Sequence, residues 1–112
     1  MNIFSYMTYP MHMETTLSIE KLEKVAFILK TIAHPLRLGM VDLLTHHDRL
    51  SVNEICEKLN AEQSLVSHHL TNMKLKGILD SSRDGKNIYY SLKMKEVVKV
   101  IACMESCDAI PD

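Results

Sequence analysis

The chain has 112 residues, of which 46% are hydrophobic, and its formal net charge is −1. This length favours one domain with a single core, and the hydrophobic content excludes a disordered chain. No apolar run approaches the roughly 18 residues of a membrane span, and no secretory signal pattern is present at the N-terminus. The three irregularly spaced cysteines disfavour a disulfide framework. We therefore expect a protein of the reducing cytoplasm.

Positive charge is concentrated in the middle of the sequence. Residues 61–95 contain six lysines and arginines against three acidic residues, a net charge of +3. Residues 96–112 contain one lysine against four acidic residues, a net charge of −3. A basic middle beside an acidic tail can direct one surface towards phosphate groups while the whole chain stays near neutral.

Residues 1–16 are expected to form an N-terminal arm. They contain four of the eight methionines, and Pro10 also lies in this segment. Such an arm is either loose or docked on a partner subunit, and a loose arm is favoured because chain termini are rarely tied down. Residues 17–112 are expected to form one folded domain.

A first helix is predicted to start at Ser18, whose hydroxyl can cap its first turn. Phe27 lies outside the apolar stripe of this helix, which indicates that a second face is also covered, for example by another subunit. A single exposed aromatic residue is the simpler alternative. The apolar stripe consists of Leu22, Val25, Ala26, Leu29, Ile32 and Ala33.

A second helix is predicted to start at Pro35, because proline suits the first turn of a helix. One face of this helix carries Leu36, Met40, Leu43 and Leu44. Residues 45–48 are predicted to form a polar turn. The adjacent His46 and His47 resemble metal ligands, but solvated side chains account for them better.

Residues 51–77 have the pattern of a helix-turn-helix. Arg49–Ser51 is a candidate short strand, and Ser51 with Glu54 matches the capping box at the start of a helix. Asn60 suits the left-handed position that ends this helix. A second helix then runs from Gln63 until Gly77 closes it in the same way.

The two sides of this second helix differ in character. At about 100° per residue, Val66, Leu70 and Met73 fall on an inner face. His69 lies nearer that apolar side and is predicted to pack rather than to contact DNA. Leu75 falls on the polar side, where it is expected to cover the base of the following hairpin. The outer face carries Gln63, Ser64, Ser67, His68, Thr71 and Lys74.

Short hydrogen-bonding side chains on the outer face suit the reading of base edges in DNA. An ordinary surface helix would carry mostly Glu and Lys there. A solvated polar face is the alternative, but the preceding helix and the following hairpin favour a DNA-recognition helix.

A β-hairpin is predicted around Asp84-Gly85, because this dipeptide joins two strand-like runs at residues 78–83 and 87–92. Arg83 and Lys86 near its tip suit contacts to phosphate or the minor groove. A last helix starts near Lys93. One face of it carries Met94, Val97, Val98, Ile101 and Met104.

The order of these elements predicts a mainly α protein with a small antiparallel β-hairpin. The order is helix, helix, short strand, helix, helix, hairpin and helix. This arrangement of five helices and a wing is a winged helix-turn-helix, and we expect residues 17–112 to bind DNA through it.

Three motifs resemble those of the ArsR/SmtB family of bacterial transcriptional repressors, over roughly residues 20–105. They are Ala33–Leu38 (AHPLRL), Gln63–Leu70 (QSLVSHHL) and Asp84–Leu92 (DGKNIYYSL). The resemblance implies a homodimer joined through the first and last helices, bound to an inverted-repeat DNA operator and released by an inducer. It implies base contacts by Gln63, Ser64, Ser67 and His68. The implied dimer interface includes Phe27, Val97, Ile101 and Met104.

This sequence matches the known inducer sites of the family poorly. Cys56 matches the first cysteine of one family metal site, but Lys58 stands in place of the second. Of the positions that match another family site, only Glu96 and Cys107 could bind metal. Cys103 and Cys107 are one turn apart and could bind a soft metal or metalloid, or be oxidised, in a dimer. Their alternative role as small apolar residues is favoured.

The sequence therefore predicts a dimeric, sequence-specific transcriptional regulator, most simply a repressor that a metal ion, a metalloid or thiol oxidation releases from DNA. The alternative is a winged-helix protein-interaction module without DNA binding. An enzyme is not expected, because the chain lacks a glycine-rich phosphate loop, a nucleophile elbow and a His-Glu-x-x-His motif.

Overall fold

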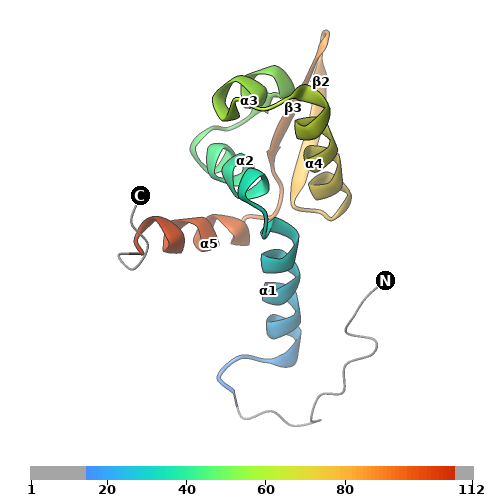
Figure 1. Ribbon diagram of the computed structural model, residues 1–112. Coiled ribbons are helices and arrows are strands. Elements are labelled where there is room, and N and C mark those ends of the chain that lie inside the picture. The colour runs from blue at the N-terminus through green and yellow to red at the C-terminus, as the bar shows by residue number, and fades with distance from the viewer. Residues whose placement is uncertain (1–14, 108–112) are drawn as a thin grey trace.

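The structure, a computed structural model, describes residues 15–107 (Figure 1). The predicted N-terminal arm at residues 1–16 therefore falls almost wholly outside the described residues. Within the described range, none of the helices combines the length and the hydropathy that crossing a bilayer requires. The elements in chain order are α1 (Ile19–Ile32), α2 (Pro35–His46), β1 (Leu50–Ser51), α3 (Val52–Leu59), α4 (Gln63–Leu75), β2 (Leu79–Asp84), β3 (Asn87–Leu92) and α5 (Glu96–Glu105).

This order confirms the winged helix-turn-helix expected from the sequence. The three strands form an antiparallel sheet in the order β1-β3-β2. In β1, Leu50 pairs with Tyr90 and Ser51 pairs with Tyr89, so the short strand anchors the helix pair α3–α4 to the wing. Figure 1 shows the hairpin of β2 and β3 extending from one end of the molecule, while α1 and α5 lie towards the other.

The hairpin turn contains two residues, since Asp84 pairs with Asn87 across it. Gly85 occupies the first central position with φ of 65°, where a side chain would be strained. Glycine at this position is typical of a type II′ turn, whose twist matches that of the flanking strands. The two strands of the wing are consequently joined by a tight two-residue turn at its tip.

One core joins the helices to the sheet. Ile55 of α3, Leu70 of α4 and Val97 of α5 are each 0% exposed. Gly39 of α2 permits the close approach of α3, because a methyl group there would lie 3.1 Å from Leu59 Cδ2. The buried hydrophobic residues are Ile28, Ile32, Met40, Val41, Leu44, Leu50, Ile55, Val66, Leu70, Met73, Ile78, Leu79, Tyr90, Leu92, Val97 and Ile101.

The buried face of α1 differs from the predicted stripe. Ile28, Thr31 and Ile32 are buried, whereas Leu29 is 47% exposed and Ala33 is exposed. Thr31 is accommodated because its hydroxyl donates to the carbonyl oxygen of Phe27 at 2.7 Å. Only the C-terminal half of α1 is fully packed within the chain, so most of the predicted stripe remains partly accessible.

Two helix boundaries also differ from the prediction. Helix α2 continues through Thr45 and His46, which were expected in the turn. Helix α5 begins at Glu96 rather than near Lys93. Before the helix begins, the backbone amides of Lys93 and Met94 donate to the carbonyl oxygen of Ile78 at 2.9 and 3.2 Å, which ties this segment to the residue that follows Gly77.

Gly77 ends α4 as the sequence predicted, with φ of 82°. The amide of Ile78 donates to the carbonyl of Met73, and the amide of Gly77 donates to that of Lys74, both at 3.0 Å. These two bonds form a Schellman motif, and Ile78 and Met73, at the positions where this motif usually has an apolar contact, are both buried in the core.

We predict that Gly77→Ala destabilises the fold by about 1–2 kcal/mol, because a Cβ is disfavoured in the left-handed conformation. No heavy atom lies within 4 Å of the added Cβ, so a steric clash does not contribute. Gly77→Asn should lose less stability than Gly77→Ala, since asparagine tolerates this conformation. Urea unfolding of the three proteins measures the difference, and an equal loss in both variants would contradict a conformational cause.

Candidate nucleic-acid interface

The helix-turn-helix is held by the local bonds that the sequence predicted. The Ser51 hydroxyl accepts from the amide of Glu54 at 3.1 Å, and the Glu54 carboxylate accepts from the amide of Ser51 at 2.9 Å. The hydrogen bond that the backbone amide of Ser51 donates to this carboxylate lowers the pKa of Glu54 below its ordinary value. Asn60 adopts the left-handed conformation with φ of 50°, which turns the chain from α3 into α4.

The inner face of α4 is buried, as predicted. Val66, Leu70 and Met73 are each 0% exposed. This burial fixes the rotation of the helix about its axis, because turning it would expose three large apolar side chains. The opposite face of α4 must then point outwards.

The structure places the six predicted outer residues on the accessible side of α4. Five of them are exposed and Ser67 is half-buried. Ser67 lines a surface pocket together with Gln63 of α4, Asn53 of α3 and Lys86 of the wing. The pocket brings the start of the helix pair and the hairpin tip together on one side of the molecule. The exposed residues are Gln63, Ser64, His68, Thr71 and Lys74.

The N-terminus of α4 lies at the same surface. Its N-cap residue, Glu62, makes no side-chain hydrogen bond to the first-turn amides. The amides of a first turn have no partner within the helix, and together they form a site for anionic groups such as phosphate.

Both predicted wing residues, Arg83 and Lys86, are exposed. A further cation, Arg49, lies beside them and was not singled out from the sequence. Its guanidinium carbon lies 4.0 Å from the centre of the Tyr89 ring, and its Nη2 lies 3.3 Å from Oδ2 of Asp84. Because Arg49 partly neutralises Asp84, the wing presents a more positive surface than its own residues suggest.

His69 packs inside the protein, as predicted, and holds α4 by a polar contact. It is 7% exposed, and its Nδ1 accepts a hydrogen bond of 2.9 Å from Nε of Arg37. Nη1 of Arg37 also donates to the carbonyl of Thr31 at 3.0 Å. One arginine on α2 therefore joins the end of α1 to the recognition helix. Removing one partner of such a buried bond costs roughly 1–3 kcal/mol.

The environment of His69 favours its neutral form. Burial, and then the charge of Arg37 and the neighbouring rings of His34 and His68, lower its pKa below 6.5. The ring of His34 is centred 4.7 Å away, and that of His68 is centred 5.5 Å away. Since Nδ1 accepts from Arg37, the neutral ring carries its proton on Nε2.

Several other residues lie elsewhere than the sequence suggested. Leu75 does not cover the base of the hairpin, because its side chain is 81% exposed. Val97 and Ile101, expected at a dimer interface, are 0% and 3% exposed within the single chain and pack in its own core. Phe27 and Met104 do remain accessible, at 38% and 46%.

The three cysteines are free thiols at separate positions in the fold. Cys103 is exposed, whereas Cys56 and Cys107 are half-buried. Cys56 packs against the core from α3, which gives it a structural role within the chain. Cys103 and Cys107 lie at the end of α5 and just beyond it.

The geometry defines a winged helix-turn-helix DNA-binding protein. Residues 34–81 match the family model described as "Bacterial regulatory protein, arsR family". The chain is 44% identical to the transcriptional repressor PagR of Bacillus anthracis over 80 residues, which cover 71% of this chain and 80% of PagR. It is also 36% identical to the cadmium resistance regulatory protein CadC of Listeria innocua over 81 residues, covering 72% and 66%.

Solved structures agree with these sequence relatives. The crystal structure of PagR matches with a TM-score of 0.69 and 40% identity, covering 78% of this chain and 99% of PagR. HlyU from Vibrio cholerae matches with a TM-score of 0.74 and 25% identity, covering 83% and 100%. The chain belongs to the ArsR family of transcriptional regulators.

We predict that the stability of the protein depends on pH through His69. The neutral ring stabilises the fold above pH 6.5, and this contribution is lost as the pH falls below 6.5 towards the lowered pKa of the folded state. Urea unfolding at pH 7.5 and 5.5 measures the loss. His69→Asn keeps a hydrogen-bond acceptor near the position of Nδ1 but cannot titrate. The free energy of unfolding of this variant should therefore fall less between pH 7.5 and 5.5 than that of wild type. Equal losses would exclude this role for His69.

Proposed function

We propose that the protein is a dimeric repressor that binds an inverted-repeat operator through the exposed face of α4. The observation that carries this proposal is the row of short hydrogen-bonding side chains on that face, beside a positively charged wing. Such side chains match the donors and acceptors of base edges in the major groove. The name of PagR, a transcriptional repressor, supports repression as the direction of control.

The proposed base contacts come from the first two turns of α4, because the start of a recognition helix enters the groove most deeply. Gln63 and Ser64 begin the helix, and Ser67 and His68 follow one turn later on the same side. Thr71 and Lys74 continue this face and are suited to the sugar-phosphate backbone or to bases nearer the groove edge.

The wing is proposed to contact the backbone beside the groove. Lys86 shares a pocket with Gln63 and Ser67, so a duplex against α4 would lie close to the hairpin tip. Arg83 is exposed on β2 near the same tip. Cations at these positions lower the free energy of binding to any sequence by releasing counterions.

Dimerisation is proposed to use α1 and α5, which lie away from the wing in Figure 1. Large apolar side chains on and beside these helices are accessible in the single chain. Burying them against a second subunit would remove them from water. They are Leu17, Phe27, Leu29, Val98 and Met104.

A soft metal, a metalloid or an oxidant is the proposed inducer, acting on the thiols of Cys103 and Cys107. The exposure of Cys103 and its place on α5, next to the proposed interface, support a link between thiol chemistry and dimer geometry. The name of the relative CadC, a cadmium resistance regulator, supports a response to a thiol-binding metal.

The deciding experiment is a titration of the protein against a duplex from its own promoter and against a scrambled duplex of equal length. We expect preferential binding to the promoter duplex, with an affinity that falls steeply as salt rises. Absence of binding to both duplexes at low salt would overturn the proposed function. Sedimentation equilibrium, with Phe27→Glu as the interface variant, tests the dimer separately.

We predict that Ser67→Ala and His68→Ala each weaken binding to the specific duplex by about 1–3 kcal/mol, as expected for the loss of a base contact. Binding to the scrambled duplex should change little, and circular dichroism should show an unchanged fold. Fluorescence anisotropy with both duplexes makes the measurement. An unchanged specific affinity in both variants would remove the base-reading role of this turn.

We predict that Lys86→Ala weakens binding to all duplexes alike and lowers the slope of log affinity against log salt by about one unit, as for the loss of one phosphate contact. Lys99→Ala is the matched control, because it removes the same charge from α5, away from the wing. A loss confined to one operator sequence, or an equal change in the control, would contradict a phosphate contact by Lys86.

A further inference from the structure

Three metal-ligating side chains meet where α2 and α5 lie against each other. They are Asp42 and His46, one turn apart on α2, and Glu105 at the end of α5. One ligand atom from each residue lies within 4.8 Å of the other two, and all three residues are exposed. Within residues 15–107, no other cluster of three His, Cys, Asp or Glu side chains has this geometry.

The hydrogen bonds of His46 determine which of its ring atoms faces Glu105. Its Nδ1 lies 2.9 Å from the backbone carbonyl oxygen of Asp42, which can only accept, so Nδ1 carries a proton. The Thr45 hydroxyl lies 3.0 Å from the same nitrogen. In the neutral ring, Nε2 is then an acceptor with a lone pair.

This Nε2 lies 3.3 Å from Oε1 of Glu105, which is also an acceptor. Two acceptors at this distance repel unless a positive species lies between them. A proton on Nε2 is one such species, and a metal ion bound by both atoms is the other. A histidine whose Nδ1 donates to a backbone carbonyl while Nε2 stays free is the usual arrangement of a metal-binding histidine.

We propose that Asp42, His46 and Glu105 form a binding site for a divalent cation of the zinc, cobalt or nickel type. One imidazole with two carboxylates suits these metals, whereas calcium and magnesium prefer oxygen ligands alone. The exposure of the three residues leaves the remaining coordination positions to water. This site contains no thiol and is distinct from Cys103 and Cys107.

A bound cation would join two elements that are far apart in the sequence. Asp42 and Glu105 both border a shallow apolar pocket lined by Leu38, Ile101 and Met104, so the metal would close the rim of the seam between α2 and α5. Occupancy would therefore restrain the end of α5 against the body of the domain.

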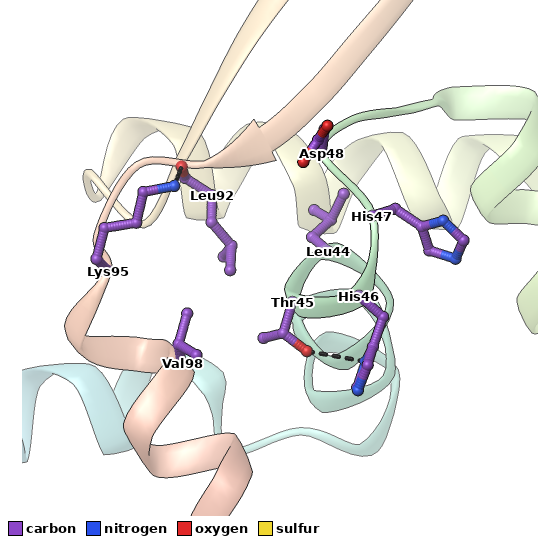
Figure 2. A pocket seen from close by; sticks show the side chains of 8 residues that line it. All are labelled: Leu44, Thr45, His46, His47, Asp48, Leu92, Lys95 and Val98. Atoms are coloured by element: carbon purple, nitrogen blue, oxygen red, sulfur yellow. Dashed lines mark hydrogen bonds between the residues drawn. The ribbon is translucent and has the colours of Figure 1, made fainter.

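His47 offers a matched control. Figure 2 shows that the rings of His46 and His47 project in different directions from the end of α2, with the His46 ring hydrogen-bonded to Thr45. His47 is exposed and does not belong to the three-residue cluster. Replacing it removes one adjacent histidine while leaving the proposed ligands in place.

Equilibrium dialysis of the reduced, full-length protein against Co²⁺ tests the site without requiring DNA, so its result is independent of the proposed function. Loss of a group that only hydrogen-bonds to a metal ligand weakens metal binding by about tenfold or more, and loss of the ligand itself should weaken it at least as much. We therefore expect His46→Ala and Glu105→Gln to weaken Co²⁺ binding at least about tenfold. His47→Ala should bind like wild type, and the double variant Cys103→Ser/Cys107→Ser should keep the Co²⁺ binding that His46→Ala loses.

Two further measurements distinguish the site from other modes of binding. The visible spectrum of bound Co²⁺ should lack the sulfur-to-cobalt charge-transfer band that thiolate ligands produce. Co²⁺ should also raise the melting temperature of wild type and His47→Ala but not that of His46→Ala, because a ligand of the folded state stabilises it. The proposal is overturned if wild type binds no Co²⁺, if His47→Ala loses as much as His46→Ala, or if binding disappears with the two cysteines.

Discussion

The orientation of α4 depends on three apolar side chains packed against the core. Val66, Leu70 and Met73 have no exposed surface, and rotating the helix would bring all three into water. Their burial decides which residues face outwards, although none of them is suited to contact DNA. The polar face is thus positioned by core packing on the opposite side of the helix. This packing does not depend on the sequence of the DNA. This arrangement separates the stability of the fold from the choice of operator, since outer residues can change without disturbing the core.

Hydrogen bonds from Arg37 also fix the position of α4. Arg37 donates to His69 on α4 and to the carbonyl of Thr31 at the end of α1. Apolar contacts tolerate small sliding movements, whereas hydrogen bonds to fixed atoms do not. The same arginine therefore relates the recognition helix to α1, which is proposed to form part of the dimer interface. In a dimer, the spacing between the two recognition helices would depend on this connection, and the spacing has to match the half-sites of the operator.

Local patterns predicted most of the fold. The capping box at Ser51, the left-handed Asn60 and the glycine at the hairpin turn act through nearby atoms, so the sequence reveals them. The start of α5 could not be found in this way, because the segment before it is held by hydrogen bonds from Lys93 and Met94 to Ile78, which is distant in the sequence. The outer face of α4 followed from helical periodicity, whereas the contact of Arg37 with His69 joins residues 32 positions apart. The group of Asp42, His46 and Glu105 also needs the fold, since Glu105 lies on a different helix.

The paired length of its strands, as well as its charge, determines what the wing can reach. Its two strands are paired along six residues each, and the turn that joins them contains only Gly85 and Lys86. The distance from the core to Lys86 is therefore set by the number of strand pairs, at roughly 3.4 Å for each residue along the strand. Removing one pair would retract the tip by that length and change the face on which the terminal side chains lie. The number of strand pairs therefore sets how far the hairpin tip extends, and under the proposed mode of DNA binding, a longer or shorter wing would place its cations at a different distance from the bases that face α4.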